Sequence, residues 1–230
     1  MIDPQFRGPS SSGNGGYVCG RLAAWVDAPG VEVTLRRPPP LERPLSVVAD
    51  REGARLLDDG ELVAEAGAAA VSLAPPRTVS IGQGRTAEAG YLGDLNHSFP
   101  ECFVCGPARA AGDGLRLRPG PVPGEPLVAT TWHPDDSLAA GDGRVRPEFV
   151  WAALDCPGAF AVESQSGRGT RVLGRLAVRI DERPRVGAGH VVVGWPLGGE
   201  GRKREAGTAL FDDVGALLAV GRAVWIELRP

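Results

Sequence analysis

The chain has 230 residues, enough for one large domain or for two domains of about 110 residues each. Its formal charge of -3 and pI of about 5.7 argue against a nucleic-acid-binding surface, which requires an excess of basic residues. Lys203 is the only lysine among 25 basic residues, an arginine bias typical of a GC-rich bacterial coding sequence.

Targeting signals and disulfides are not expected. No stretch approaches the roughly 18 apolar residues that a membrane-spanning helix needs. Residues 1–12 are polar and rich in Pro, Gly and Ser, unlike a signal peptide. Four cysteines, at positions 19, 102, 105 and 156, are too few for a disulfide scaffold. We therefore expect a cytoplasmic protein with free thiols and no membrane contact.

The first half of the chain predicts a helix followed by an antiparallel meander. Residues 15–26 can form the helix, with Ser12 or Asn14 as its N-cap and Ala28-Pro29-Gly30 as its end. Strand-like segments follow at 31–37, 45–50, 54–57 and 61–71. We interpret residues 74–97, with two adjacent prolines and scattered glycines, as an irregular connection.

The second half repeats this plan. A helix is expected over residues 147–162, because Pro147 suits a first helical turn, and it should stop or kink near Pro157. Strands are expected at 115–118, 126–132, 172–180, 190–195, 203–212 and 217–228. The fold class is therefore α+β, with an N-terminal unit at 1–73, a connection at 74–97 and a C-terminal unit at 98–230. Edge-to-edge pairing of the units would give one continuous curved sheet around two central helices.

Three segments together resemble the hotdog superfamily of acyl-CoA thioesterases and hydratases. Asn14-Gly15-Gly16-Tyr17 resembles the opening of the central helix in double-hotdog acyl-CoA thioesterases. The run from Cys102 to Pro107, followed by Gly114-Leu115-Arg116-Leu117, is similar to the Cys-Phe-x-Cys-Gly…Gly-Leu-x-Leu segment of many hotdog thioesterases. Residues 149–158 resemble a hotdog central helix with an acidic residue, here Asp155. The resemblance implies a double hotdog fold.

The chemistry follows from a helix N-terminus and a carboxylate. Gly15 and Gly16 expose backbone N–H groups, and the helix dipole adds positive potential that suits a thioester oxygen as it becomes negative. Asp155 can activate water or attack the carbonyl directly. In the family these parts commonly come from paired central helices, one from each unit. Here Ala24 replaces the acid of the first helix, and Arg146-Pro147 replaces the glycines of the second. The sequence therefore indicates one composite site, with Gly15 and Gly16 facing Asp155.

Other residues are assigned to this site less directly. Asn14 and Tyr17 flank the glycines, and Glu205 and Thr208 lie in a strand facing the second helix, where they are expected to contact substrate or position water. The charged run 200–205 is expected to be a solvated hairpin, with CoA phosphate binding as its alternative.

Metal and redox sites are not expected. Cys102 and Cys105 form a single Cys-x-x-Cys without a second pair, and His97 with Cys19 or Cys156 would make only an improvised zinc set. A redox pair lacks its usual strand-to-helix context. Cys156 next to Asp155 is an alternative nucleophile, but no adjacent histidine activates it. We interpret the cysteine segment as a packed loop near the acyl entrance.

The function that follows is hydrolysis of an acyl thioester, carried by CoA or acyl carrier protein, without a cofactor or metal. A non-catalytic acyl- or ligand-binding hotdog protein is the main alternative, and a hotdog hydratase or dehydratase is the second. A scaffold role would leave neither an acyl tunnel nor a bound acyl group. A homodimer is possible through an exposed sheet edge or back face.

Overall fold

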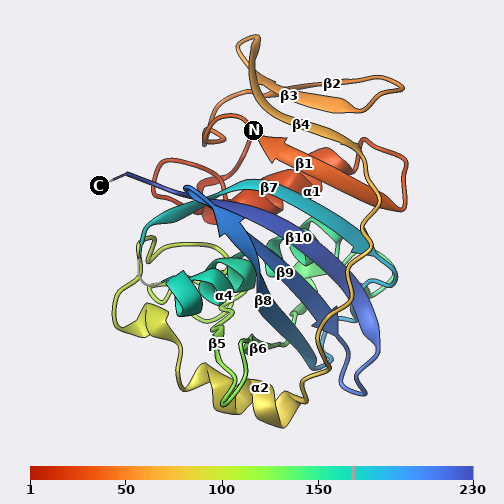
Figure 1. The fold of residues 1–230 in the computed structure, drawn as a ribbon. Helices are drawn as coiled ribbons and strands as arrows, with labels where there is room; N and C mark the ends of the chain where they lie inside the picture. The colour runs from red at the N-terminus through yellow and green to blue at the C-terminus, as the bar shows by residue number, and fades with distance from the viewer. Residues whose placement is uncertain (167–168, 230) are drawn as a thin grey trace.

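The computed structural model describes residues 1–166 and 169–229, which form one ten-stranded antiparallel sheet wrapped around helices (Figure 1). The helices are α1 (Gly15–Ala23), α2 (Ile81–Glu88), α3 (Pro147–Ala153) and α4 (Cys156–Ser166). The strands are β1 (Gly30–Leu35), β2 (Ser46–Ala49), β3 (Ala54–Asp58), β4 (Glu61–Ala68), β5 (Gly120–Pro121), β6 (Val128–Trp132), β7 (Arg171–Ile180), β8 (His190–Glu200), β9 (Lys203–Phe211) and β10 (Leu217–Glu227). Short 3-10 turns occur at Pro4–Phe6, Leu92–Asp94 and Asp136–Leu138.

The two predicted units share the sheet. Its strand order is β2-β3-β4-β1-β7-β10-β9-β8-β6-β5, so the first four strands of the chain lie together at one end. β1 joins β7 in antiparallel register, with Val33 opposite Leu176, and both side chains are fully buried. This continuous sheet confirms the predicted architecture.

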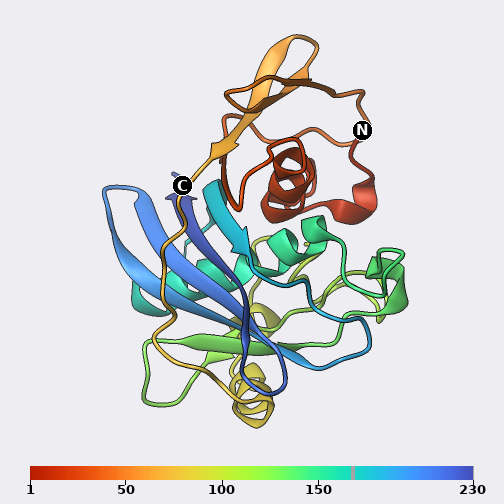
Figure 2. The same cartoon turned by 90° about the vertical axis from the view of Figure 1, so that its right-hand side faces the viewer.

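The central helices lie on the concave side of the sheet. α1 packs on β1, β4 and β7, α4 packs on β8 and β9, and α1 lies beside α3 (Figure 2). Strand alternation supplies this core, because every second side chain of a strand faces the helices. On β8, for example, Val192 faces the helices, while Val191 and Val193 belong to a second apolar cluster on the other face.

The connection is more ordered than the sequence suggested. Within residues 74–97, α2 begins at a capping box in which the Ser80 side chain accepts from Gln83 N–H and the Gln83 side chain accepts from Ser80 N–H. Val79 and Ala87 of this segment are buried against the outer apolar cluster. The expectation of an irregular connection was therefore wrong for residues 81–88, where local capping and burial outweigh two helix-weakening glycines.

Two further expectations need correction. Residues 115–118 form no strand, since Leu115 and Leu117 donate their N–H groups to the carbonyls of Phe103 and Val104 in the preceding loop, while Arg116 takes a positive φ of 52°. The helix expected over residues 147–162 is split into α3 and α4. Pro157 has no N–H for the Ala153 carbonyl, so the helix breaks at Leu154 and Asp155, close to the expected kink.

Candidate functional site

The N-terminus of α1 is built by Asn14. Its Oδ1 accepts the N–H of Tyr17 at 2.9 Å, which caps the helix, and its backbone N–H donates to the Phe6 carbonyl at 2.7 Å. Asn14 is only 2% exposed, so this helix end lies inside the protein. The cap leaves the Nδ2 group of Asn14 and the N–H of Gly16 to serve another acceptor.

Asp155 is that acceptor. Its Oδ2 accepts from Gly16 N–H at 2.9 Å and from Asn14 Nδ2 at 3.0 Å. The carboxylate comes from the break between α3 and α4 in the second unit, whereas both donors come from the first unit. The structure thus brings together Gly16, Asn14 and Asp155, which the sequence places about 140 residues apart.

The second oxygen of Asp155 differs from the first. Oδ1 is buried and has no hydrogen-bond partner among the residues that the structure describes. Burial raises the pKa of Asp155 to about 7, and the bonds from Gly16 and Asn14 oppose this rise. A buried oxygen without a partner is costly, so its presence points to a function rather than to packing alone.

Glycine allows the two helices to approach this closely. A Cβ on Gly16 would lie 2.6 Å from Asp155 Cβ and 2.8 Å from the Trp151 carbonyl oxygen. One turn later, a Cβ on Gly20 would lie 2.6 Å from Glu148 Cα. These two glycines therefore share the face of α1 that contacts α3. Gly15 points elsewhere, and its Cβ would meet the side chain of Leu173 at 2.8 Å.

Tyr17 belongs to an aromatic cluster beside the site. Its ring stacks on Phe6 at 4.2 Å between centroids, and Phe103 and Phe149 complete the cluster. Its hydroxyl accepts from Arg21 at 2.9 Å. The cluster packs the N-terminal segment, through Phe6, against the first turn of α1.

Thr208 and Glu205 lie on opposite faces of β9. The fully buried Thr208 donates its hydroxyl to the Leu154 carbonyl at 2.9 Å and so fastens the helix break that carries Asp155. Glu205 instead pairs with Arg222 on the outer face. Residues three apart on a strand point in opposite directions, so the structure does not bring Glu205 to the site.

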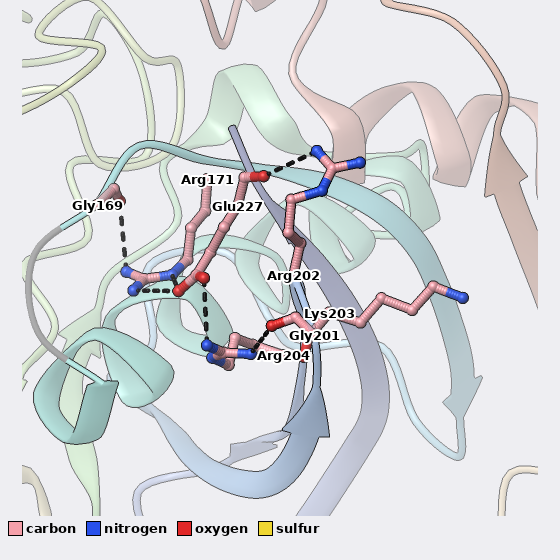
Figure 3. Close-up of polar contacts among 7 residues, drawn as sticks. All are labelled: Gly169, Arg171, Gly201, Arg202, Lys203, Arg204 and Glu227. Carbon is pink, nitrogen blue, oxygen red and sulfur yellow. Dashed lines mark hydrogen bonds and ion pairs between the residues drawn. The ribbon is translucent and has the colours of Figure 1, made fainter. Parts of the chain in front are cut away.

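The charged run 200–205 forms part of a cationic cluster at the ends of the central strands β7, β9 and β10 (Figure 3). Glu227 accepts from Arg171 at 2.9 Å and from Arg204 at 3.2 Å, while its backbone carbonyl accepts from Arg202 at 3.2 Å. The side chain of Lys203 extends away from this network (Figure 3). Two arginines thus pair with the Glu227 carboxylate, while Arg202 bonds its backbone carbonyl and Lys203 makes no contact in this network.

Solved structures share this fold. A candidate thioesterase from Novosphingobium aromaticivorans matches with a TM-score of 0.64 and 16% identity over 99% of this chain and 94% of that chain. The tesB protein of Mycobacterium avium subs paratuberculosis matches with a TM-score of 0.61 and 17% identity over 94% and 88%. A candidate oleoyl thioesterase from Lactobacillus plantarum gives 0.52 and 11% over 87% and 75%.

These similarities confirm the double hotdog fold and, at their low identities, nothing finer. No family model matches the sequence, and no curated protein matches it. Among the described residues, no helix is long and apolar enough to cross a membrane.

Proposed function

We propose that this chain hydrolyses an acyl thioester at the composite site formed by Gly16 and Asp155. One observation carries the proposal: Oδ2 of the buried Asp155 carboxylate in the second unit lies 2.9 Å from the backbone N of Gly16 at a helix N-terminus of the first unit, while its Oδ1 has no partner among the described residues. This pairs a donor for a developing oxyanion with a base for water. The names of the matched structures, which include thioesterases, agree with this chemistry.

The reaction requires the carbonyl oxygen of the thioester to replace the Asp155 carboxylate as the acceptor of the Gly16 backbone N–H. The thioester oxygen accepts the N–H of Gly16, and the positive end of the α1 dipole stabilises its charge as it grows. Asp155, released from that bond, takes a proton from water while the water oxygen bonds to the carbonyl carbon. The C–S bond then breaks, and the thiolate leaves with that proton as a thiol.

Residues around the pair would act by positioning. Asn14 holds Asp155 through its Nδ2 group, and Thr208 holds the Leu154 carbonyl next to it. Tyr17 lies on the same helix end and would border the acyl group, whereas the Cα of Gly15 faces Leu173 instead. Glu205 is not part of this proposal because its carboxylate pairs with Arg222 on the outer face.

The carrier is proposed to be coenzyme A or acyl carrier protein, both of which present phosphate. Three residues of the charged run, Arg202, Lys203 and Arg204, supply charge of the matching sign. A reversal of charge at Lys203, whose side chain stands apart from the Glu227 network, should raise the KM for acyl-CoA with little change in kcat.

A non-catalytic acyl-binding protein is the second candidate. It is favoured by the closed state of the site, where the Gly16 N–H already donates to Asp155 Oδ2 and Asp155 is only 2% exposed. In that case the contact would join the two units and would not open to a carbonyl.

A thiol-release assay separates the two candidates. The purified chain is incubated with a panel of short, long and aromatic acyl-CoAs, and free CoA is followed over time. Turnover on one acyl class supports hydrolysis. Absence of release across the panel, together with an acyl ligand found by native mass spectrometry, would support the binding protein instead.

A further inference from the structure

Three cysteines converge next to the composite site. The Sγ atoms of Cys102, Cys105 and Cys156 all lie within 4.8 Å of one another, and those of Cys102 and Cys156 are 3.7 Å apart. All three side chains are buried. The first two belong to the loop that precedes Gly106, and the third begins α4 directly after Asp155.

Nitrogen donors face two of these sulfurs. Asn14 Nδ2 lies 3.8 Å from the Cys102 sulfur, and His97 Nε2 lies 3.2 Å from the Cys105 sulfur. The Nδ1 atom of His97 accepts from Phe99 N–H at 2.9 Å, which leaves the ring proton on Nε2. Hydrogen-bond donors aimed at sulfur stabilise the thiolate over the thiol, and the thiolate is the form that binds metal.

The burial of three thiols at one point favours a cation as their common partner. Their sulfurs all lie within 4.8 Å of one another, so one ion can contact all three. A divalent ion would bind them as thiolates, and its charge would compensate theirs inside the protein.

We propose that Cys102, Cys105 and Cys156 form a structural binding site for a thiophilic divalent cation, with zinc as the best fit. At a Zn–S distance of about 2.3 Å, tetrahedral geometry places ligand sulfurs about 3.8 Å apart, which matches the Cys102–Cys156 separation. His97 Nε2 lies 3.2 Å from the Cys105 sulfur but outside the group of mutually close sulfurs, so it would become the fourth ligand only if its ring turned toward the ion, its proton moved to Nδ1 and the bond from Phe99 N–H were given up. The ion ties the loop before Gly106 to the start of α4, and so fixes the neighbouring Asp155.

This site revises the expectation from sequence that no metal is bound. The spacing of the cysteines showed only one Cys-x-x-Cys pair. The third thiol, Cys156, lies 51 positions after Cys105 and comes close to the pair only in the folded chain. Cys19, which the sequence also offered as a partner, stays outside the cluster of ligand atoms. The inference stands apart from the proposed hydrolysis, because a structural ion needs no substrate.

Metal content tests the proposal directly. The full chain is purified under reducing conditions without chelator, and bound metals are counted by mass spectrometry. The chelated protein is then titrated with Co²⁺, which reports thiolate ligands through sulfur-to-cobalt charge-transfer absorption. We expect one zinc per chain and a charge-transfer band that saturates at one Co²⁺ per chain. His97→Ala should retain the band and bind Co²⁺ more weakly.

Matched variants locate the ligands. Cys102→Ser, Cys105→Ser and Cys156→Ser should each lose most of the metal, whereas Cys19→Ser, which changes another buried cysteine, should keep it. Wild-type protein that holds no metal and gives no charge-transfer band would overturn the proposal even if the serine variants fail to fold. A disulfide among the three cysteines in place of metal, detected by intact mass, would also overturn it.

Discussion

Substitution of Gly16 by alanine tests the close approach of α1 to the helix break. The added Cβ would lie 2.6 Å from Asp155 Cβ, 2.8 Å from the Trp151 carbonyl oxygen and 3.0 Å from Ala152 Cα. None of these atoms is the end of a flexible side chain, so the helices themselves must separate. Overpacking of this kind costs about 1–3 kcal/mol, which outweighs the gain of up to about 1 kcal/mol from the higher helix propensity of alanine.

The expected net loss of about 1–2 kcal/mol corresponds to a Tm lower by about 2–8 °C for a chain of this size. Urea denaturation and calorimetry measure it. Gly82→Ala is the matched control, because Gly82 lies in the exposed helix α2 and its Cβ would meet only Ser80 Oγ at 4.0 Å. That variant should be neutral or more stable. A Tm for Gly16→Ala within about 1 °C of wild type, or an equal loss in Gly82→Ala, would refute the packing argument.

Three further outcomes follow from single contacts. Asn14→Ala removes the cap on Tyr17 N–H and should lower the free energy of unfolding in urea by about 1–2 kcal/mol. Asn14→Ser, which keeps a cap, should recover about half of that loss. Equal losses in the two variants would contradict the capping role. Thr208→Val leaves the Leu154 carbonyl without its side-chain donor and should cost about 1–2 kcal/mol by the same assay, so an unchanged midpoint would contradict that role. Burial lowers the pKa of His190, so its contribution to stability is present above the unfolded pKa of about 6.5 and is lost as the pH falls through the lower folded pKa. The Tm difference between wild type and His190→Gln should therefore shrink from pH 7.5 to pH 5, and a constant difference would rule this out.

Local signals in the sequence were sufficient for most of the sheet. Alternating apolar residues and Gly-containing turns placed β1 to β4, β7, β9 and β10 within three residues of their observed bounds. The start of β8 was also correct, but this strand continues to Glu200, five residues beyond its expected end at 195. The cap at Asn14 was one of two candidates, and the structure selects it. These features depend on neighbours in the chain, which a single sequence displays.

The errors arose where distant residues decide the conformation. Helix α2 carries a Ser80–Gln83 capping box that the sequence offers, but its burial on the outer face depends on β6 and β8. Residues 115–118 have the alternation of a strand, yet their N–H groups bond to the loop at Phe103. The conformation of both segments depends on contacts with residues distant in the sequence, which local propensity does not reveal.

The candidate site was only partly accessible from sequence. The prediction that Gly16 faces Asp155 came through resemblance, and the hydrogen bond between them in the structure is consistent with it. The position of Glu205 contradicts its expected contact with the site, although strand alternation already placed it opposite Thr208. The convergence of Cys156 with Cys102 could not be predicted, because it depends on how α4 packs against a loop 54 residues away.

The most direct test of the central claim compares Asp155→Asn with Asp58→Asn. Both change a buried carboxylate, but Asp58 pairs with Arg43 and Arg37 on the first unit, outside the composite site. With the acyl-CoA that wild type hydrolyses fastest, we expect Asp155→Asn to lose about 10²–10⁴-fold in kcat, and Asp58→Asn to stay within a few fold. Equal turnover by wild type and Asp155→Asn, with both proteins folded, would contradict a thioesterase site at Asp155.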